Sequence, residues 1–220
     1  MPLKKAGVAV ILVVVLLALL IALMVLPEAL PEALPEATSQ NAMFHVLVRL
    51  FGLYGYLFLA IATLTTPFLK EVTQAFGRPF LRVHHVFSVL GLILITLHPV
   101  SDALRWQSLL GFVPQFGSWW YFWWTAGRPA FYLLYIGVVA ALLRSKAPSY
   151  WRPFHWLMYV VLFFGIVHAN YIGEDFENLA IRYLFDALMV ASIAGLVFKR
   201  LSNFRAKRMY SANGAKKGLR

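Results

Sequence analysis

The chain has 220 residues, of which 61% are hydrophobic and 13% are charged. Soluble domains are about 45–50% apolar and about 25% charged, so a soluble globule of this length lacks the polar surface to cover such an interior. Cysteine is absent, which excludes disulfide frameworks, thiolate metal sites and cysteine nucleophiles. The net charge of +11 would suggest a nucleic-acid partner in a soluble chain, but in a membrane protein it bears first on topology. The composition therefore predicts an integral membrane protein with no nucleic-acid partner.

Six segments are apolar over enough residues to cross about 30 Å of hydrocarbon as helices. They cover residues 7–26, 46–66, 83–100, 127–143, 154–172 and 179–199. We therefore expect an all-α membrane protein with six transmembrane helices. The first segment is longer than the core of about 7–15 apolar residues in a signal peptide, so we favour a retained helix over a cleaved signal.

The connecting and terminal segments divide the rest of the chain. Residues 1–6 form a short N-terminus, and residues 200–220 form a basic tail that we expect on the inner surface. Residues 27–45 include about three Pro-Glu-Ala-Leu repeats. Because proline has no amide hydrogen, we expect a stiff, non-helical external linker there. Residues 46–199 make up the main transmembrane domain.

Charged residues separate into two sets of loops. Sixteen of the 20 basic residues lie at the two ends and in alternate loops, with Glu71 as the only acid beside them. The basic set is Lys4, Lys5, Lys70, Arg78, Arg82, Arg144, Lys146, Arg152, Lys199, Arg200, Arg205, Lys207, Arg208, Lys216, Lys217 and Arg220. The acids of the other loops are Glu28, Glu32, Glu36, Asp102, Glu174, Asp175 and Glu177. Since cytoplasmic loops carry the excess of Lys and Arg, we expect a multi-pass protein of the plasma (inner) membrane with both termini cytoplasmic. The aromatic run at residues 119–124 then falls in the outer membrane interface.

Four histidines form two pairs with nearly equal spacing. His84 and His98 lie 14 residues apart in the third segment, and His155 and His168 lie 13 residues apart in the fifth. These spacings rise about 21 Å and about 19.5 Å along two helices of the same direction. The histidines therefore fall into two layers across the bundle, and each layer can ligate one haem iron from both sides. A di-metal site is disfavoured, because the two layers are too far apart to share a coordination sphere.

Helical angles distinguish neighbouring histidines. At about 100° per residue, 14 residues return to within about 40° of the starting face, whereas 13 residues miss it by about 140°. His84, rather than His85, therefore shares a face with His98. On the fifth helix we expect a bend or bulge near Gly165, or different ring rotamers, to bring its two histidines together. We interpret His45 and His85 as interfacial polar residues, with a haem propionate or a loop carbonyl as the alternative partner of His85.

The histidines and their neighbours resemble the ferric reductase-like transmembrane domain, a family shared by ferric reductases, NADPH oxidases and the haem-binding membrane subunit of a periplasmic methionine sulfoxide reductase system. The resemblance extends from about residue 46 to 199 and rests on Arg82-Val83-His84-His85, His98-Pro99, Gly127-Arg128-Pro129, Trp151-Arg152-Pro153-Phe154-His155-Trp156 and His168. It implies a central bundle that holds two stacked b-type haems, with iron ligands His84, His98, His155 and His168. It also implies electron transfer from a cytoplasmic donor to an external acceptor. The histidine spacings match the two-haem branch, whereas the methionine sulfoxide reductase subunit lacks part of the set.

From this resemblance we expect the haem-bearing component of a ferric reductase-like oxidoreductase, with no catalytic residue of its own. We expect no FAD or NAD(P) site in the chain, so electrons would come from a separate cytoplasmic flavin reductase or from membrane quinol. One alternative is a membrane subunit that passes electrons to a periplasmic reductase, such as a methionine sulfoxide reductase. Another is a haem-free assembly or sensor protein on the same scaffold.

Arginines near the outer ends of the helices can neutralise haem propionates, which are costly in a low dielectric. Arg49 and Arg128 are the candidates for this role, with simple snorkelling to the interface as the alternative. Arg182 precedes Asp186 by four residues, so an intrahelical ion pair accounts for it.

Overall fold

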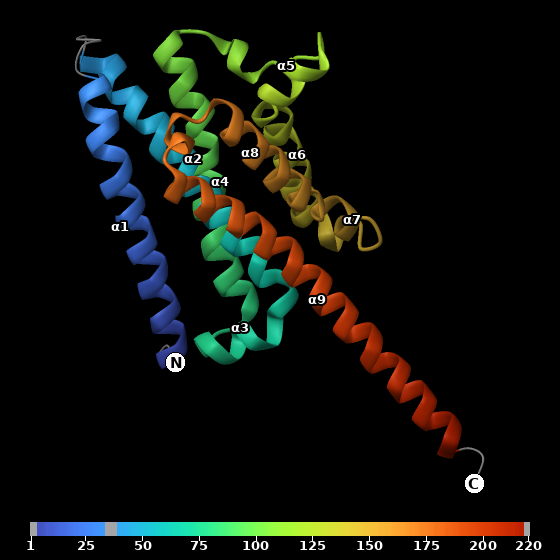
Figure 1. The fold of residues 1–220 in the computed structure, drawn as a ribbon. Helices are drawn as coiled ribbons and strands as arrows, with labels where there is room; N and C mark the ends of the chain where they lie inside the picture. The colour runs from blue at the N-terminus through green and yellow to red at the C-terminus, as the bar shows by residue number, and fades with distance from the viewer. Residues whose placement is uncertain (1–3, 34–38, 218–220) are drawn as a thin grey trace.

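Long apolar helices dominate the computed structural model, which describes residues 4–33 and 39–217 (Figure 1). Six of them are long and apolar enough to span a membrane, and no strand occurs among the described residues. The spans are Lys5–Pro27, Asn41–Phe76, Phe80–Trp106, Gly127–Ser145, Trp151–Ile172 and Leu179–Ala206. The predicted all-α fold with six helices of membrane length is therefore confirmed.

The α-helices are α1 (Lys5–Ala33), α2 (Ser39–Thr65), α3 (Leu69–Phe76), α4 (Phe80–Trp106), α5 (Trp119–Trp124), α6 (Gly127–Leu142), α7 (Trp151–His155), α8 (Leu157–Ile172) and α9 (Leu179–Lys217). Four 3₁₀ turns connect them: η1 (Thr66–Phe68), η2 (Leu109–Phe112), η3 (Leu143–Ser145) and η4 (Glu174–Glu177). The second predicted segment thus continues through η1 into the short helix α3. The fifth is divided between α7 and α8.

The predicted linker at residues 27–45 is mostly helical. Helix α1 continues through Pro27 and Pro31 to Ala33, α2 begins at Ser39, and residues 34–38 lie outside the described residues. Each proline removes only one amide donor, while Ala29 between them is fully buried in the core. Tertiary packing of that turn therefore outweighs the local cost of the prolines.

The basic tail also differs from the prediction, since residues 200–217 are not a separate segment but the end of α9. This stretch contains good helix formers such as Arg, Lys, Ala and Met and no proline, so the helix continues beyond the apolar part. Figure 1 shows the C-terminal half of α9 extending beyond the other helices. Two contacts hold α9 to the bundle where its apolar part ends: Lys199 pairs with Glu71 of α3, and Arg200 lies over the Trp156 ring at 4.4 Å.

Helix α2 is the centre of the bundle. In the span Asn41–Phe76, half of the residues in the most apolar stretch are buried inside the protein. In every other span the buried share is at most 22%. The most extensive packing of α2 is against α4, where Gly55 and Gly91 lie at the crossing. A Cβ on Gly55 would lie 2.7 Å from the Ile95 amide nitrogen, and one on Gly91 would lie 2.9 Å from the Leu59 amide nitrogen. The two helices therefore approach as closely as glycine allows.

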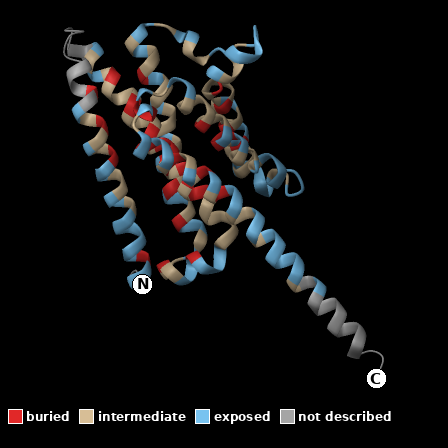
Figure 2. Cartoon of the chain, in the orientation of Figure 1, coloured by how far each residue is buried: buried red, intermediate tan, exposed pale blue. Residues whose placement is uncertain are grey.

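Two helix hairpins face each other across the interior. Helices α2 and α4 form one of them, and α6 and α8 form the other. Figure 2 shows buried residues concentrated where the helices meet and exposed residues along α1 and along α9 where it leaves the bundle. The exposed side chains of α1 and α4 include Leu12, Leu16, Leu23, Val86 and Ile93. Such apolar outer faces suit contact with lipid.

Candidate functional site

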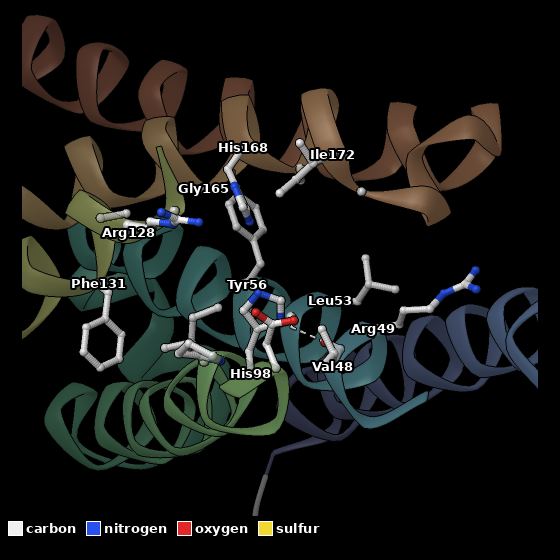
Figure 3. Close-up of a pocket in the computed structure, with 18 of the residues that line it drawn as sticks. Val48, Arg49, Leu53, Tyr56, His98, Arg128, Phe131, Gly165, His168 and Ile172 are labelled. Carbon is white, nitrogen blue, oxygen red and sulfur yellow. Dashed lines mark hydrogen bonds between the residues drawn. The ribbon is translucent and has the colours of Figure 1, made fainter. Parts of the chain in front are cut away.

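The structure brings the four predicted histidines together in two facing pairs. His98 of α4 faces His168 of α8, with ring centres 6.4 Å apart and ring planes at 81°. His84 of α4 faces His155 of α7, with ring centres 6.3 Å apart and ring planes at 78°. Figure 3 shows His98 and His168 pointing toward each other from opposite sides of a pocket. After the predicted topology, we call His98 and His168 the outer pair, and His84 and His155 the inner pair.

Each of the four rings is oriented by a hydrogen bond from Nδ1 to a backbone carbonyl. His98 donates to Val48 at 2.8 Å, and His168 donates to Trp124 at 3.2 Å. In the inner pair, His84 donates to the Ala62 carbonyl at 3.2 Å, and His155 donates to the Gly137 carbonyl at 3.3 Å. Because a carbonyl oxygen only accepts, the proton of each neutral ring belongs on Nδ1. The lone pair is then on Nε2, as in a histidine prepared to bind a metal.

The ring separations match two axial ligands of one metal ion. With about 2.0–2.1 Å from metal to imidazole nitrogen and about 1.1 Å from nitrogen to ring centre, two rings on opposite sides of an ion have centres about 6.3 Å apart. The observed separations are 6.4 Å and 6.3 Å. Among the described residues, no three His, Asp or Glu side chains gather into a set that could hold a metal. An ion between either pair would take its further ligands from water or from a bound group such as a porphyrin.

A cavity of about 350 Å³, the outer cavity, lies between the hairpins and is lined by both histidines of the outer pair. This volume lies within the range of about 300–1,000 Å³ that is usual for small-molecule sites. Most of its wall is apolar, with Leu53, Phe131 and Ile172 among the lining residues (Figure 3). The outer pair therefore fits a large apolar cofactor in both its donor atoms and its surroundings.

The inner pair borders a cavity of only about 60 Å³, the inner cavity. Met158 and Tyr159 line it beside the two rings. Leu59 and Leu134 line both cavities and separate one from the other. The donor atoms are therefore the same at the two pairs, but the space around them is not.

The helix that carries His155 and His168 is interrupted at Trp156, and not near Gly165 as we expected. Helix α7 ends just before this residue and α8 begins just after it. The Tyr159 amide donates to the Trp156 carbonyl, three residues back. A 3₁₀ step of this kind turns the chain by about 120° per residue instead of about 100°. The break therefore reduces the angular mismatch of the 13-residue spacing.

A charged cluster borders the outer cavity, with Arg49 and Asp175 buried and Glu174 exposed. For its acids the sequence pattern had indicated only topology. Arg49 is 8% exposed and Asp175 is 4% exposed. Nε and Nη2 of Arg49 donate to Oδ1 of Asp175 at 3.0 Å and 2.7 Å. Glu174 lies 3.4 Å from Nη1 of Arg49 and accepts from Nε2 of His45 at 3.1 Å. His45 is thus a buried member of this cluster, 5% exposed. Two acids directly after the fifth segment, with an arginine in the outer turn of the second, were the available signal.

The two predicted propionate partners both line the outer cavity, but in different electrostatic settings. Arg49 is already neutralised by Asp175. Arg128 donates from Nη1 to the Val113 carbonyl at 3.0 Å, a neutral partner that leaves its positive charge in place. Arg128 is therefore the better placed of the two for an anionic group. Arg182 makes the expected ion pair with Asp186, one turn later in α9, at 4.0 Å. His85, which we interpreted as an interfacial polar residue, is exposed.

Two glycines make room for the rings of the outer pair. A Cβ on Gly52 would lie 2.9 Å from Nδ1 of His98, and a Cβ on Gly127 would lie 2.9 Å from Cγ of His168. Real Cβ atoms essentially never come within 3.0 Å of another heavy atom in this way. A side chain at either position would therefore push the ring away from its carbonyl partner.

Comparison of the chain with protein-family models, with curated proteins and with solved structures finds no match. The resemblance to the ferric reductase-like family therefore rests on the sequence motifs alone.

Proposed function

We propose that this protein carries electrons across a membrane through two b-type haems, from a cytoplasmic-side donor to an external acceptor. The observation that carries the proposal is the arrangement of four histidines in two facing pairs, each ring held by a carbonyl at Nδ1. Bound haem would supply one-electron redox chemistry. The 14 residues from His84 to His98 rise about 21 Å in a bilayer core of about 30 Å, so the two pairs reach toward opposite membrane faces.

The chain's own residues would hold, orient and shield the cofactors. The histidines would supply the nitrogen ligands that hold the haem iron, and the carbonyls at Nδ1 fix the ring orientation and raise the basicity of Nε2. Leu59 and Leu134 exclude water from the region between the pairs, since both line the two cavities and are 8% and 1% exposed. Arg128 offers a positive charge to an outer propionate.

The charge distribution supports a protein of the plasma (inner) membrane with both termini on the cytoplasmic side. The start of α1 contacts α3, where Gly7 packs against Phe76, and Lys199 of α9 pairs with an acid of the same short helix. The basic residues of the N-terminus, of α3 and of α9 therefore gather at one end. Glu174 and Asp175 lie at the other end, beside the outer pair. Under the positive-inside rule the first end faces the cytoplasm.

Haem content tests the proposal directly. The purified protein is expected to bind two haems per polypeptide, measured as pyridine haemochrome, and to show b-type bands in a reduced-minus-oxidised spectrum. Proteoliposomes should then pass electrons from an internal donor to an external acceptor. A correctly folded but colourless protein would reject the proposal in favour of a haem-free assembly or sensor protein.

Gly127→Ala is expected to lower the haem affinity of the outer pair by about 10–100-fold, the usual effect of disturbing a group that orients a metal-binding histidine. The added methyl group must displace the His168 ring, which it would otherwise approach to 2.9 Å. Absorbance titration of haem-free protein with haemin measures the affinity. Gly117→Ala is the matched control, because no atom lies within 4 Å of a Cβ at that position. Equal affinities of the two variants would contradict the role of Gly127.

Electron delivery by a soluble flavin reductase is expected to slow as salt increases. The cytoplasmic end is basic, and surface charge mainly raises association rates, with a Debye length of about 8 Å at physiological ionic strength. Deletion from Ser202 onward should slow the same step without changing haem content. Haem reduction rates in proteoliposomes, with a flavin reductase plus NADH or with a quinol, at low and high salt, measure this. Reduction by quinol alone, unaffected by salt or by the deletion, would reject the soluble donor and leave the haem pathway unaffected.

A further inference from the structure

We infer that the two histidine pairs take up haem unequally: the outer pair binds it first, and the inner pair binds it only after Met158 and Ser88 move. The inference rests on the proposed function, because it concerns the same two pairs. The cavity beside the outer pair has a volume of about 350 Å³, and the cavity beside the inner pair has a volume of about 60 Å³. Since the ring separations are almost equal, the difference lies in the neighbouring side chains.

Met158 fills the room beside the inner pair. It follows His155 by three residues, and it lines the inner cavity. Its Cε lies 2.3 Å from the position that a Cβ on Gly137 would take, so the absence of a side chain at Gly137 opens the space that Met158 takes. The carbonyl of Gly137 also accepts the hydrogen bond that orients His155. The glycine therefore belongs to the site, and the methionine occupies the place it leaves open.

The chemistry of methionine suits a side chain that fills a space in one state and leaves it in another. Its side chain is unbranched, has three rotatable bonds and adapts to irregular gaps. A branched or aromatic side chain would be fixed by its few rotamers. Met158 can therefore withdraw when a larger group enters, at a lower cost than most apolar residues.

The Ser88 hydroxyl lies beside Nε2 of His84, the nitrogen that would bind a metal in the inner pair. The hydroxyl oxygen lies 3.2 Å from Nε2 of His84, and 2.8 Å from the carbonyl oxygen of the same residue. The lone pair of His84 is on Nε2, so a hydrogen bond donated there would compete with a metal for the same electrons. The single hydroxyl proton of Ser88 is donated to the nearer acceptor, the His84 carbonyl, so Ser88 can move away from Nε2 and keep that hydrogen bond. In the part of the chain that the structure describes, no hydroxyl lies in hydrogen-bond contact with Nε2 of either outer histidine.

If uptake is unequal, haem binding at the inner pair determines whether the protein can conduct electrons. A chain with haem only at the outer pair has no carrier at its cytoplasmic end, so it accepts no electrons from a donor on that side. Filling the inner pair completes the path. Loading of the inner site, rather than of the outer one, would therefore switch the protein from inactive to conducting.

Titration of the full-length haem-free protein with haemin in nanodiscs tests the inference. The wild type is expected to bind in two phases, with the second at least about tenfold weaker than the first. His98→Ala should abolish the tight phase, and His84→Ala should abolish the weak one. Met158→Ala and Ser88→Ala should each strengthen the weak phase several-fold. The matched controls are Met189→Ala, at a buried methionine of α9, and Ser192→Ala, at a serine whose hydroxyl is also bonded to a carbonyl four residues back. Neither control should strengthen the weak phase, because neither residue lines the inner or the outer cavity.

Three outcomes would overturn the inference. Two phases of equal affinity in the wild type would show that the sites are equivalent. A tight phase lost in His84→Ala would show that the inner pair binds first. A weak phase that neither Met158→Ala nor Ser88→Ala strengthens would show that these side chains do not limit binding. Each of these outcomes leaves the proposed haem protein intact, whereas no binding of haemin at any ratio would reject the proposed function as well.

Discussion

His98→Ala and His168→Ala are each expected to remove the haem of the outer pair and to leave the inner one. Each ring supplies one of only two protein nitrogens at that position, and no set of three metal-binding side chains is present in residues 4–33 and 39–217 to replace it. His84→Ala and His155→Ala should have the reciprocal effect on the inner haem. Haem per chain, together with a redox titration that resolves two potentials, measures both outcomes.

His85→Ala is the matched control for this series. His85 is adjacent to His84 and its ring centre lies 6.1 Å from that of His84. His85 is nevertheless exposed and lines neither cavity, so both haems should remain. If His98→Ala and His168→Ala both keep two low-spin haems, the assignment of the outer pair is wrong. If His85→Ala loses the inner haem while His84→Ala keeps it, the ligand is the other neighbour.

Arg49→Met is expected to lower the free energy of unfolding by about 3–5 kcal/mol, the usual cost of removing one partner of a buried ion pair. The substitution leaves the Asp175 carboxylate, which is 4% exposed, without its two hydrogen bonds from the guanidinium group. Helix α2 would also lose one of its links to η4 beside the outer cavity and keep the hydrogen bond between His45 and Glu174. Denaturation of the detergent-solubilised protein with SDS, followed by far-UV circular dichroism, measures the change.

Arg182→Met provides the control with the same substitution. The Arg182–Asp186 pair is 4.0 Å long and about half exposed, so its loss should cost no more than about 1 kcal/mol. The double substitution Arg49→Met with Asp175→Leu should recover much of the stability, because no uncompensated charge then remains buried. Equal effects of Arg49→Met and Arg182→Met would show that the buried pair has no special role.

The sequence predicts the membrane helices well because lipid imposes a simple rule on each segment separately. A chain that crosses hydrocarbon must satisfy its own backbone, so each span is a long apolar helical segment that can be recognised without its neighbours. Local rules fail where packing opposes them. Helix α1 continues through Pro27 because the turn around Ala29 is buried, and the break between α7 and α8 occurs at Trp156 instead of near Gly165.

The pairing of the histidines also follows from the sequence, for a geometric reason. Two helices with the same direction and with histidines 14 and 13 residues apart can meet at both levels only as His84 with His155 and His98 with His168. The helical angle selects His84 over its neighbour, and the structure has His84 against His155. Both conclusions use only the rise and the angle of a helix, which are the same in any fold.

What surrounds the histidines was decided by the tertiary structure alone. The acceptors at Nδ1 of His98 and His168 are carbonyls 50 and 44 residues away, and Arg49 and Asp175 are 126 residues apart. Carbonyls carry no sequence signal, and a contact between distant helices depends on how closely those helices approach and at which rotation. The unequal space at the two pairs, about 350 Å³ and about 60 Å³, has the same origin. Sequence periodicity therefore determined which residues could meet, and helix packing determined what room and which partners they found there.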